Sequence, residues 1–186
     1  MELEQSTLAN LLRAYAITNW DLILIGDGSG SSAAQPCGWS VVIIDRRTGV
    51  RTLLVGGQNM GSITLAEALP YLMALQHFDS NIRGTIHAAD PGERQQLFVH
   101  ILTDSQHTAR AGQGKHSRDK HGAIWAGLDH FGKLGYYLNW HWFESGRENP
   151  FLLHSFTDEM ASVGRSRMMD IEQSIELYEL LPPGNS

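Results

Sequence analysis

The chain has 186 residues, a hydrophobic content of 42% and a formal net charge of −6, values that are typical of one globular domain of ordinary composition. The acidic balance argues against the broad basic surface of many nucleic-acid-binding proteins, and the single cysteine, Cys37, excludes an internal disulfide. No segment resembles a signal peptide or a membrane-spanning helix, so we expect a cytoplasmic protein without a membrane partner.

The first half of the chain alternates apolar runs with turn residues, a pattern that predicts two helices and three strands. The helices are expected at 3–16 and 64–78, and the strands at 21–26, 39–44 and 50–55. Because short connections join the three strands, they predict an antiparallel meander. The first strand contains four consecutive apolar residues, which indicates burial on both of its faces.

The second half continues with a strand at 97–103, a helix at about 120–133, an aromatic strand at 136–143 and a helix that contains Asp158. A last helix is expected at about 170–181. The element order β-β-β-α-β-α-β-α predicts an α/β protein. Its expected divisions are an N-terminal helical extension at 1–19, a main domain at 20–166, and a C-terminal helix and tail at 167–186.

Four carboxylates occupy comparable places in this order of elements. Asp27 and Asp104 each follow a buried strand, whereas Glu67 and Asp158 lie early on two helices. If the two strands are neighbours, Asp27 and Asp104 lie side by side at one edge of the sheet, with the first core helix crossing over that edge. Clustered carboxylates need a cation to stay ionised, and hard oxygen ligands suit Mg²⁺ or Mn²⁺.

Each of these carboxylates also has a purely local explanation. Asp27 and Asp104 could be turn residues, and Glu67 fits the end of a capping box that begins at Thr64. Asp158 could be a charge that the helix dipole favours near the N-terminus. The occurrence of all four residues in one order of elements favours a shared site.

These residues resemble ribonuclease H of type 1 between about residues 22 and 164. The matching segments are Asp27-Gly28-Ser29, the strand of Trp39, Ala66-Glu67, Thr103-Asp104-Ser105-Gln106 and Asp158-Glu159-Met160-Ala161. The resemblance implies a mixed five-stranded sheet in the order 3-2-1-4-5 with helices on both faces. It also implies an endonuclease that hydrolyses the RNA strand of RNA–DNA hybrids and leaves a 3′-hydroxyl and a 5′-phosphate. We expect this enzyme to be a monomer.

The resemblance assigns a role to each carboxylate. Two Mg²⁺ ions, which Mn²⁺ can replace, would lie about 3.5–4 Å apart around the scissile phosphate. Asp27 would bind both ions, and Asp158 would help to hold the ion that activates the attacking water. Glu67 and Asp104 would hold the ion that stabilises the leaving oxygen.

The resemblance also predicts contacts with the substrate. Backbone groups around Gly28 and Ser29 would contact ribose, and Gln106 would reach the minor groove, where 2′-hydroxyl groups and base edges are exposed. Some members of the family carry a basic extension. Here its counterpart is limited to three cations, Lys115, Arg118 and Lys120.

Members of the family usually have a mobile histidine on the loop before the last helix, where it assists product release. In this sequence the loop carries Arg147 after a glycine, and His154 lies four residues before Asp158, where the family commonly has asparagine. Either residue could replace the mobile histidine, and the sequence leaves both assignments open.

Two other classes of function remain open. Nucleases and integrases that act on DNA or structured RNA share this fold, and a non-catalytic binding module would agree with the acidic balance. The presence of all four carboxylates favours an enzyme, because a binding module does not need a cluster of like charges.

Overall fold

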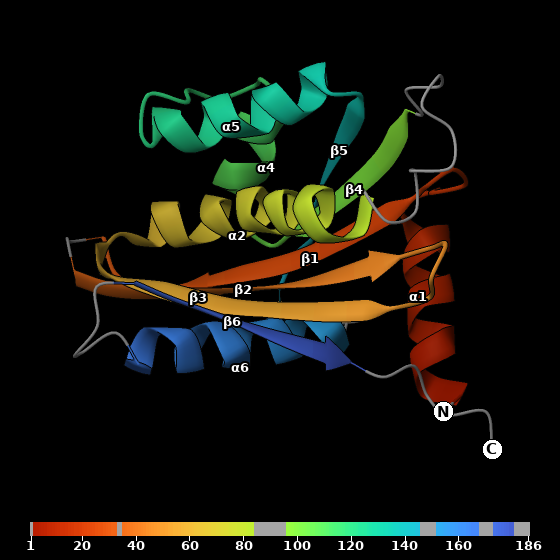
Figure 1. Ribbon diagram of the computed structural model, residues 1–186, viewed down its shortest axis with the longest axis horizontal. Helices are drawn as coiled ribbons and strands as arrows, with labels where there is room; N and C mark the ends of the chain where they lie inside the picture. Colours follow the sequence, from red (N-terminus) through yellow and green to blue (C-terminus); the bar gives the residue numbers. More distant parts are fainter. Residues whose placement is uncertain (1, 33–34, 84–95, 146–151, 168–172, 181–186) are drawn as a thin grey trace.

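The computed structural model describes residues 2–32, 35–83, 96–145, 152–167 and 173–180, and it shows a central sheet with helices on both faces (Figure 1). The strands are β1 (Leu22–Ser29), β2 (Gln35–Asp45), β3 (Arg51–Gly61), β4 (Leu97–Thr103), β5 (Tyr136–Trp142) and β6 (Gln173–Leu180). The helical elements are α1 (Glu2–Ala14), α2 (Ile63–Phe78), the π-helical turn η1 (Asp79–Arg83), α4 (Gln106–Gly112), α5 (Gly122–Lys133) and α6 (Leu152–Ser166).

The strands form one mixed sheet in the order β5-β4-β1-β2-β3-β6. β1, β2 and β3 are antiparallel neighbours, as the predicted meander requires, whereas β4 is parallel to both β1 and β5. The predicted α/β class and the strand order 3-2-1-4-5 are therefore confirmed. The sheet continues one strand further, because β6 pairs with the outer side of β3.

The helix expected at about 170–181 is wrong, because residues Gln173–Leu180 form strand β6. This strand runs antiparallel to β3, with Gln58 opposite Gln173 and Arg51 opposite Leu180. The sequence from Ser174 to Leu177 alternates polar and apolar residues, which is the period of a strand. The long edge of β3 then determines the outcome, since it offers backbone hydrogen bonds that an isolated helix would leave unused.

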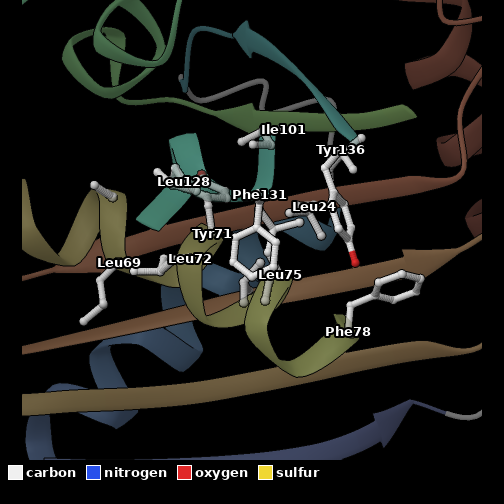
Figure 2. Close-up of a cluster of buried hydrophobic side chains, with 14 of the residues drawn as sticks. Leu24, Leu69, Tyr71, Leu72, Leu75, Phe78, Ile101, Leu128, Phe131 and Tyr136 are labelled. Atoms are coloured by element: carbon white, nitrogen blue, oxygen red, sulfur yellow. The ribbon is translucent and has the colours of Figure 1, made fainter. Parts of the chain in front are cut away.

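β1 is buried on both faces, and its side chains alternate between two hydrophobic clusters. Leu22 and Leu24 belong to the cluster under α2 and α5, whereas Ile23 and Ile25 belong to the cluster on the opposite face. Figure 2 shows the first cluster, in which side chains of α2 and α5 meet those of the strands. The strand that carries Asp27 is thus buried at the centre of the sheet.

Helices α1 and α6 cover the second face of the sheet (Figure 1). Leu11 of α1 is buried against this face, which confirms the amphipathic helix predicted near the N-terminus. Met160 and Phe156 of α6 pack against the same cluster. Among the described residues, no helix is both long and apolar enough to cross a membrane.

Candidate active site

Asp27 and Asp104 come to the same edge of the sheet because β1 and β4 are parallel neighbours. Ile25 pairs with Leu102, and each carboxylate follows its paired residue by two positions. Asp27 is only 5% exposed, and its Oδ1 accepts a hydrogen bond of 2.7 Å from the Gly28 N–H group. The side-by-side arrangement expected from the sequence is therefore present.

Helix α2 carries Glu67 over this edge because Gly28 allows the helix backbone to approach the strand closely. A Cβ atom on Gly28 would lie 2.6 Å from the carbonyl carbon of Ala66 and 2.7 Å from the backbone nitrogen of Glu67. The helix is capped by Ser62, whose side chain accepts a hydrogen bond from the Leu65 N–H group. Glu67 is therefore not the end of a capping box, and its carboxylate is available to the site.

Tyr71 holds α2 above the two strands, one helical turn after Glu67. Its buried hydroxyl group is within hydrogen-bond distance of two backbone carbonyl oxygens, 3.0 Å from that of Gly26 and 3.1 Å from that of Leu102. The Tyr71 ring lies within the core shown in Figure 2. This contact fixes the height of α2 over the strand ends and therefore the position of Glu67.

Helix α6 brings the fourth carboxylate to the same place. The Ser40 hydroxyl group on β2 donates a buried hydrogen bond of 2.7 Å to the carbonyl oxygen of Thr157. Asp158 is the next residue, and His154 lies one turn earlier on the same side of the helix.

These elements surround a pocket of about 450 Å³. Its wall contains all four predicted carboxylates together with one histidine, one glycine and two serines: Asp27, Gly28, Glu67, Asp104, Ser145, His154, Ser155 and Asp158. Residues that are far apart in the sequence thus converge on one polar cavity.

Burial, with repulsion from neighbouring carboxylates, raises the pKa of two of the four acids. Burial, assisted by the negative charges of Asp27, Asp104 and Asp158, raises the pKa of Glu67 to about 9. Burial and the charge of Asp104 raise the pKa of Asp27 to about 7. Within the described part of the chain, Glu67 Oε2 is buried without a hydrogen-bond partner. A bound cation would supply that partner and allow these groups to ionise, so the donor set fits a divalent metal ion.

His154 lies deep in the pocket between two of the carboxylates. Its Nε2 atom is 3.6 Å from Oδ2 of Asp27 and 3.6 Å from Oδ1 of Asp104. Burial would lower the pKa of His154, but the neighbouring carboxylates, Asp104 foremost, raise it overall. Burial likewise opposes ionisation of Asp104, yet polar contacts with His154 and Ser145 hold its pKa below the ordinary value.

The burial of His154 bears on the search for the mobile histidine. His154 is 3% exposed, and its ring packs edge-on against Phe143 with the ring centroids 4.7 Å apart. A side chain enclosed in this way does not match the mobile role considered for it. Arg147, the other candidate, lies outside the described residues.

The residues predicted to contact the substrate are distributed around the pocket and along α4. Gly28 lines the pocket, and the Ser29 hydroxyl group accepts a hydrogen bond of 3.4 Å from Ser162. Gln106 is exposed at the first position of α4, a short helix that the sequence did not reveal. Lys115 and Lys120 are exposed beyond the end of that helix.

Arg118 differs from these residues because its guanidinium group is used within the protein. It donates hydrogen bonds to the carbonyl oxygens of Ala111 and Gly112, at 2.7 and 3.0 Å, and forms an ion pair of 2.7 Å with Asp129. It also lies over the ring of Trp125, 5.1 Å from the centroid. These contacts connect α4 with α5 and account for Arg118 without a substrate.

Two serines of the pocket wall and a tryptophan that contacts the Asp104 backbone did not emerge from the sequence. Ser155 lies three residues before Asp158, so helical spacing could have identified it. Ser145 follows the last strand of the predicted core and has no pattern of its own. Trp142 is 42% exposed, and its Nε1–H group donates a hydrogen bond of 3.0 Å to the Asp104 carbonyl oxygen. This contact depends on the strand register, in which Trp142 of β5 lies opposite Thr103 of β4, the residue before Asp104.

Solved structures with the same arrangement of elements identify the fold. One of them is the N-terminal RNase H domain of Rv2228c from Mycobacterium tuberculosis, determined as a fusion with maltose-binding protein. It matches this chain with a TM-score of 0.59 and 13% identity. The match covers 81% of this chain and 96% of the matched chain. The chain has the RNase H fold.

Two further RNase H structures are similar to it. LC11-RNase H1, isolated from compost and solved in complex with an RNA/DNA hybrid, has a TM-score of 0.54 and 15% identity, and the match covers 80% of this chain and 99% of LC11-RNase H1. LC9-RNase H1, a type 1 RNase H with the type 2 active-site motif, has a TM-score of 0.60 and 13% identity. The match covers 82% of this chain and 75% of LC9-RNase H1.

Comparisons at the level of sequence give no relative. No protein-family model matches the chain, and no curated protein matches it significantly. The resemblance to RNase H is therefore confirmed as a likeness of fold, and the activity must be inferred from the site.

Proposed function

We propose that this chain is a metal-dependent endonuclease that hydrolyses the RNA strand of RNA–DNA hybrids. The observation that carries the proposal is the convergence of Asp27, Glu67, Asp104 and Asp158 on one pocket at the edge of an RNase H fold. A fold alone does not determine an activity, but a cluster of four carboxylates in a pocket of this size indicates a site for cations.

The four carboxylates would hold two Mg²⁺ ions, for which Mn²⁺ could substitute. The buried Oε2 atom of Glu67 supports this assignment, since a cation would provide the partner that it lacks among the described residues. When bound, such ions lower the pKa of a water molecule and neutralise negative charge on the scissile phosphate.

The residues of the chain itself would orient the reacting groups. The Gly28 N–H group fixes one oxygen of Asp27, and the absence of a side chain at Gly28 keeps the adjacent backbone open to a ribose or phosphate. Ser145 and Ser155 add hydroxyl groups to the pocket wall, where they can donate hydrogen bonds to phosphate oxygens.

We propose that the hybrid lies across the pocket and α4, with Ser29 near a ribose, Gln106 at the minor groove, and Lys115 and Lys120 near a phosphate backbone. The exposure of Gln106 and the two lysines supports this placement. The structure of LC11-RNase H1 with an RNA/DNA hybrid supports the choice of substrate by analogy of fold. Arg147 remains our candidate for assisting product release.

The test is a cleavage assay with the full chain. A labelled RNA–DNA hybrid, duplex RNA, duplex DNA and single-stranded RNA are incubated with Mg²⁺, Mn²⁺ or EDTA. We compare the wild type with Asp27→Asn and with Glu159→Gln. Glu159 is exposed next to Asp158 but does not line the pocket. Glu159→Gln therefore removes one negative charge, as Asp27→Asn does, without changing the pocket wall.

We expect the wild type and Glu159→Gln to cut the RNA strand of the hybrid and no other substrate, and to require a metal ion for this cleavage. We expect Asp27→Asn to be inactive. Cleavage of duplex DNA or duplex RNA in place of the hybrid would indicate another nuclease. Metal-independent binding of the hybrid without cleavage would indicate a binding module.

A further inference from the structure

We propose that His154 is itself a metal ligand, together with Asp27 and Asp104, and that this pocket prefers Mn²⁺ and other first-row transition ions to Mg²⁺. The inference rests on the proposed function in one respect, because it takes the pocket as a site for divalent cations. It extends that function to the class of ion and adds a nitrogen donor to a set of carboxylates.

The distances around His154 match those between ligands of a common ion. Its Nε2 atom lies 3.6 Å from Asp27 Oδ2 and 3.6 Å from Asp104 Oδ1, and the three side chains offer donor atoms within 4.8 Å of one another. Two donors with bonds of about 2.1 Å to one ion are at most about 4.2 Å apart, and both 3.6 Å distances from His154 Nε2 satisfy this limit.

One ring contact and the attachment of helix α6 to the sheet hold the imidazole in this position. The ring packs edge-on against Phe143, and the Thr157 hydroxyl group donates a hydrogen bond of 2.8 Å to the His154 carbonyl oxygen. Helix α6 is itself attached to β2 through the hydrogen bond from Ser40 to Thr157. His154 is therefore fixed before an ion binds, which is the property of a ligand in a preorganised site.

The chemistry of the donor set determines the choice of ion. Mg²⁺ binds oxygen ligands and retains several waters, whereas imidazole nitrogen suits later divalent ions of the first transition row. An imidazole added to carboxylates therefore raises the affinity most for Co²⁺ and Zn²⁺, and less for Mn²⁺, which is the weakest-binding ion of the first-row series and also accepts carboxylates. For Mg²⁺ the imidazole adds little, because this ion favours hard donors.

The competing explanation treats His154 as an internal cation that offsets the carboxylate charge. In that case the imidazole does not bind the metal, and its replacement by a neutral side chain strengthens the binding of every divalent cation. The two explanations predict opposite changes in Mn²⁺ affinity, so one set of measurements decides between them.

The experiment uses Mn²⁺ as a spectroscopic probe on the full chain without substrate. Pulsed electron paramagnetic resonance detects nitrogen that is bound directly to Mn²⁺, and protein labelled with ¹⁵N-histidine identifies that nitrogen as histidine without any substitution. The variants are His154→Asn and, as a control, His107→Asn. His107 is exposed and packs against His116 with their ring centroids 4.4 Å apart, so this control removes a surface histidine pair.

We expect the wild type and His107→Asn to show histidine nitrogen coupling, and His154→Asn to lose it. The Mn²⁺ dissociation constant should rise about tenfold or more in His154→Asn, with little change for Mg²⁺. Absence of histidine coupling in the wild type, or tighter Mn²⁺ binding by His154→Asn, would overturn the inference.

Hybrid cleavage by the same preparations separates this inference from the proposed function. Cleavage without histidine coupling refutes the ligand role of His154 and leaves the nuclease assignment standing. Histidine coupling that depends on His154, with no cleavage of any nucleic acid, supports the metal site and refutes the nuclease assignment.

Discussion

Glu67→Gln tests whether the carboxylate cluster stores unfavourable electrostatic energy when no metal is present. Glu67 has a pKa of about 9 in the folded protein, raised first by burial and then by the charges of Asp27, Asp104 and Asp158. Glutamine preserves the shape of the side chain and cannot ionise. We therefore expect the variant, in EDTA at pH 8, to be more stable than the wild type.

The magnitude follows from the linkage between protonation and folding. The ordinary pKa of a glutamate is 4.5, so the folded protein binds this proton more tightly than the unfolded chain does. Stability contributed by the protonated group is therefore fully present below the unfolded pKa and is lost as pH rises through the folded pKa. At about 1.4 kcal/mol per pH unit, the loss between pH 5 and pH 8 is about 4 kcal/mol.

Urea denaturation in EDTA at pH 5 and at pH 8 measures this loss. The wild type and the control Glu159→Gln should lose stability between the two pH values, and Glu67→Gln should lose less by the amount assigned to Glu67. Part of the decline should persist in the variant, because the pKa of Asp27 is also raised, to about 7. An equal loss in wild type and Glu67→Gln would refute the reasoning.

Three further predictions concern other parts of the site. Asp27→Asn should abolish hybrid cleavage, and in EDTA at pH 8 it should melt above the wild type, because one charge of the cluster is removed; cleavage near the wild-type rate would contradict the assignment. Gly28→Ala should lower the free energy of unfolding by about 1–3 kcal/mol, since its Cβ atom would overlap α2. Gly132→Ala, with nothing within 4 Å of the added atom, is its control in the same urea titration. Arg147→Ala should lower steady-state turnover roughly ten- to a hundredfold, and an unchanged single-turnover rate would place its action at product release.

Much of the core could be predicted because local patterns and strand ends determine it. The strand that ends before Asp104 was predicted at 97–103, and β4 has those bounds. Asp27 and Asp104 each lie two residues after one member of the Ile25–Leu102 pair, so the two strands need only be parallel neighbours for the carboxylates to meet. That geometry depends on the sheet, not on distant side chains, so a short sequence pattern is sufficient to indicate it.

Other parts depend on contacts that no local pattern encodes. The segment 173–180 becomes a strand because the edge of β3 is available to it, although its charged and apolar residues also suggested a helix. The Thr64–Glu67 spacing fitted a capping box, but α2 begins one residue after Ser62. That shift leaves Glu67 outside the cap and in the wall of the pocket.

The depth at which α6 lies against the sheet is a contact of this second kind, and it determines what His154 can do. A Cβ atom on Gly38 of β2 would collide with the backbone of Ala161 and Arg165, and one on Gly164 would collide with the carbonyl oxygen of Gly56 on β3. Glycine on each side therefore allows the helix to approach the strands more closely than other residues would permit. At this depth the imidazole reaches Asp27 and Asp104 from a rigid helix. A group placed in that way is suited to bind an ion and poorly suited to follow a departing product.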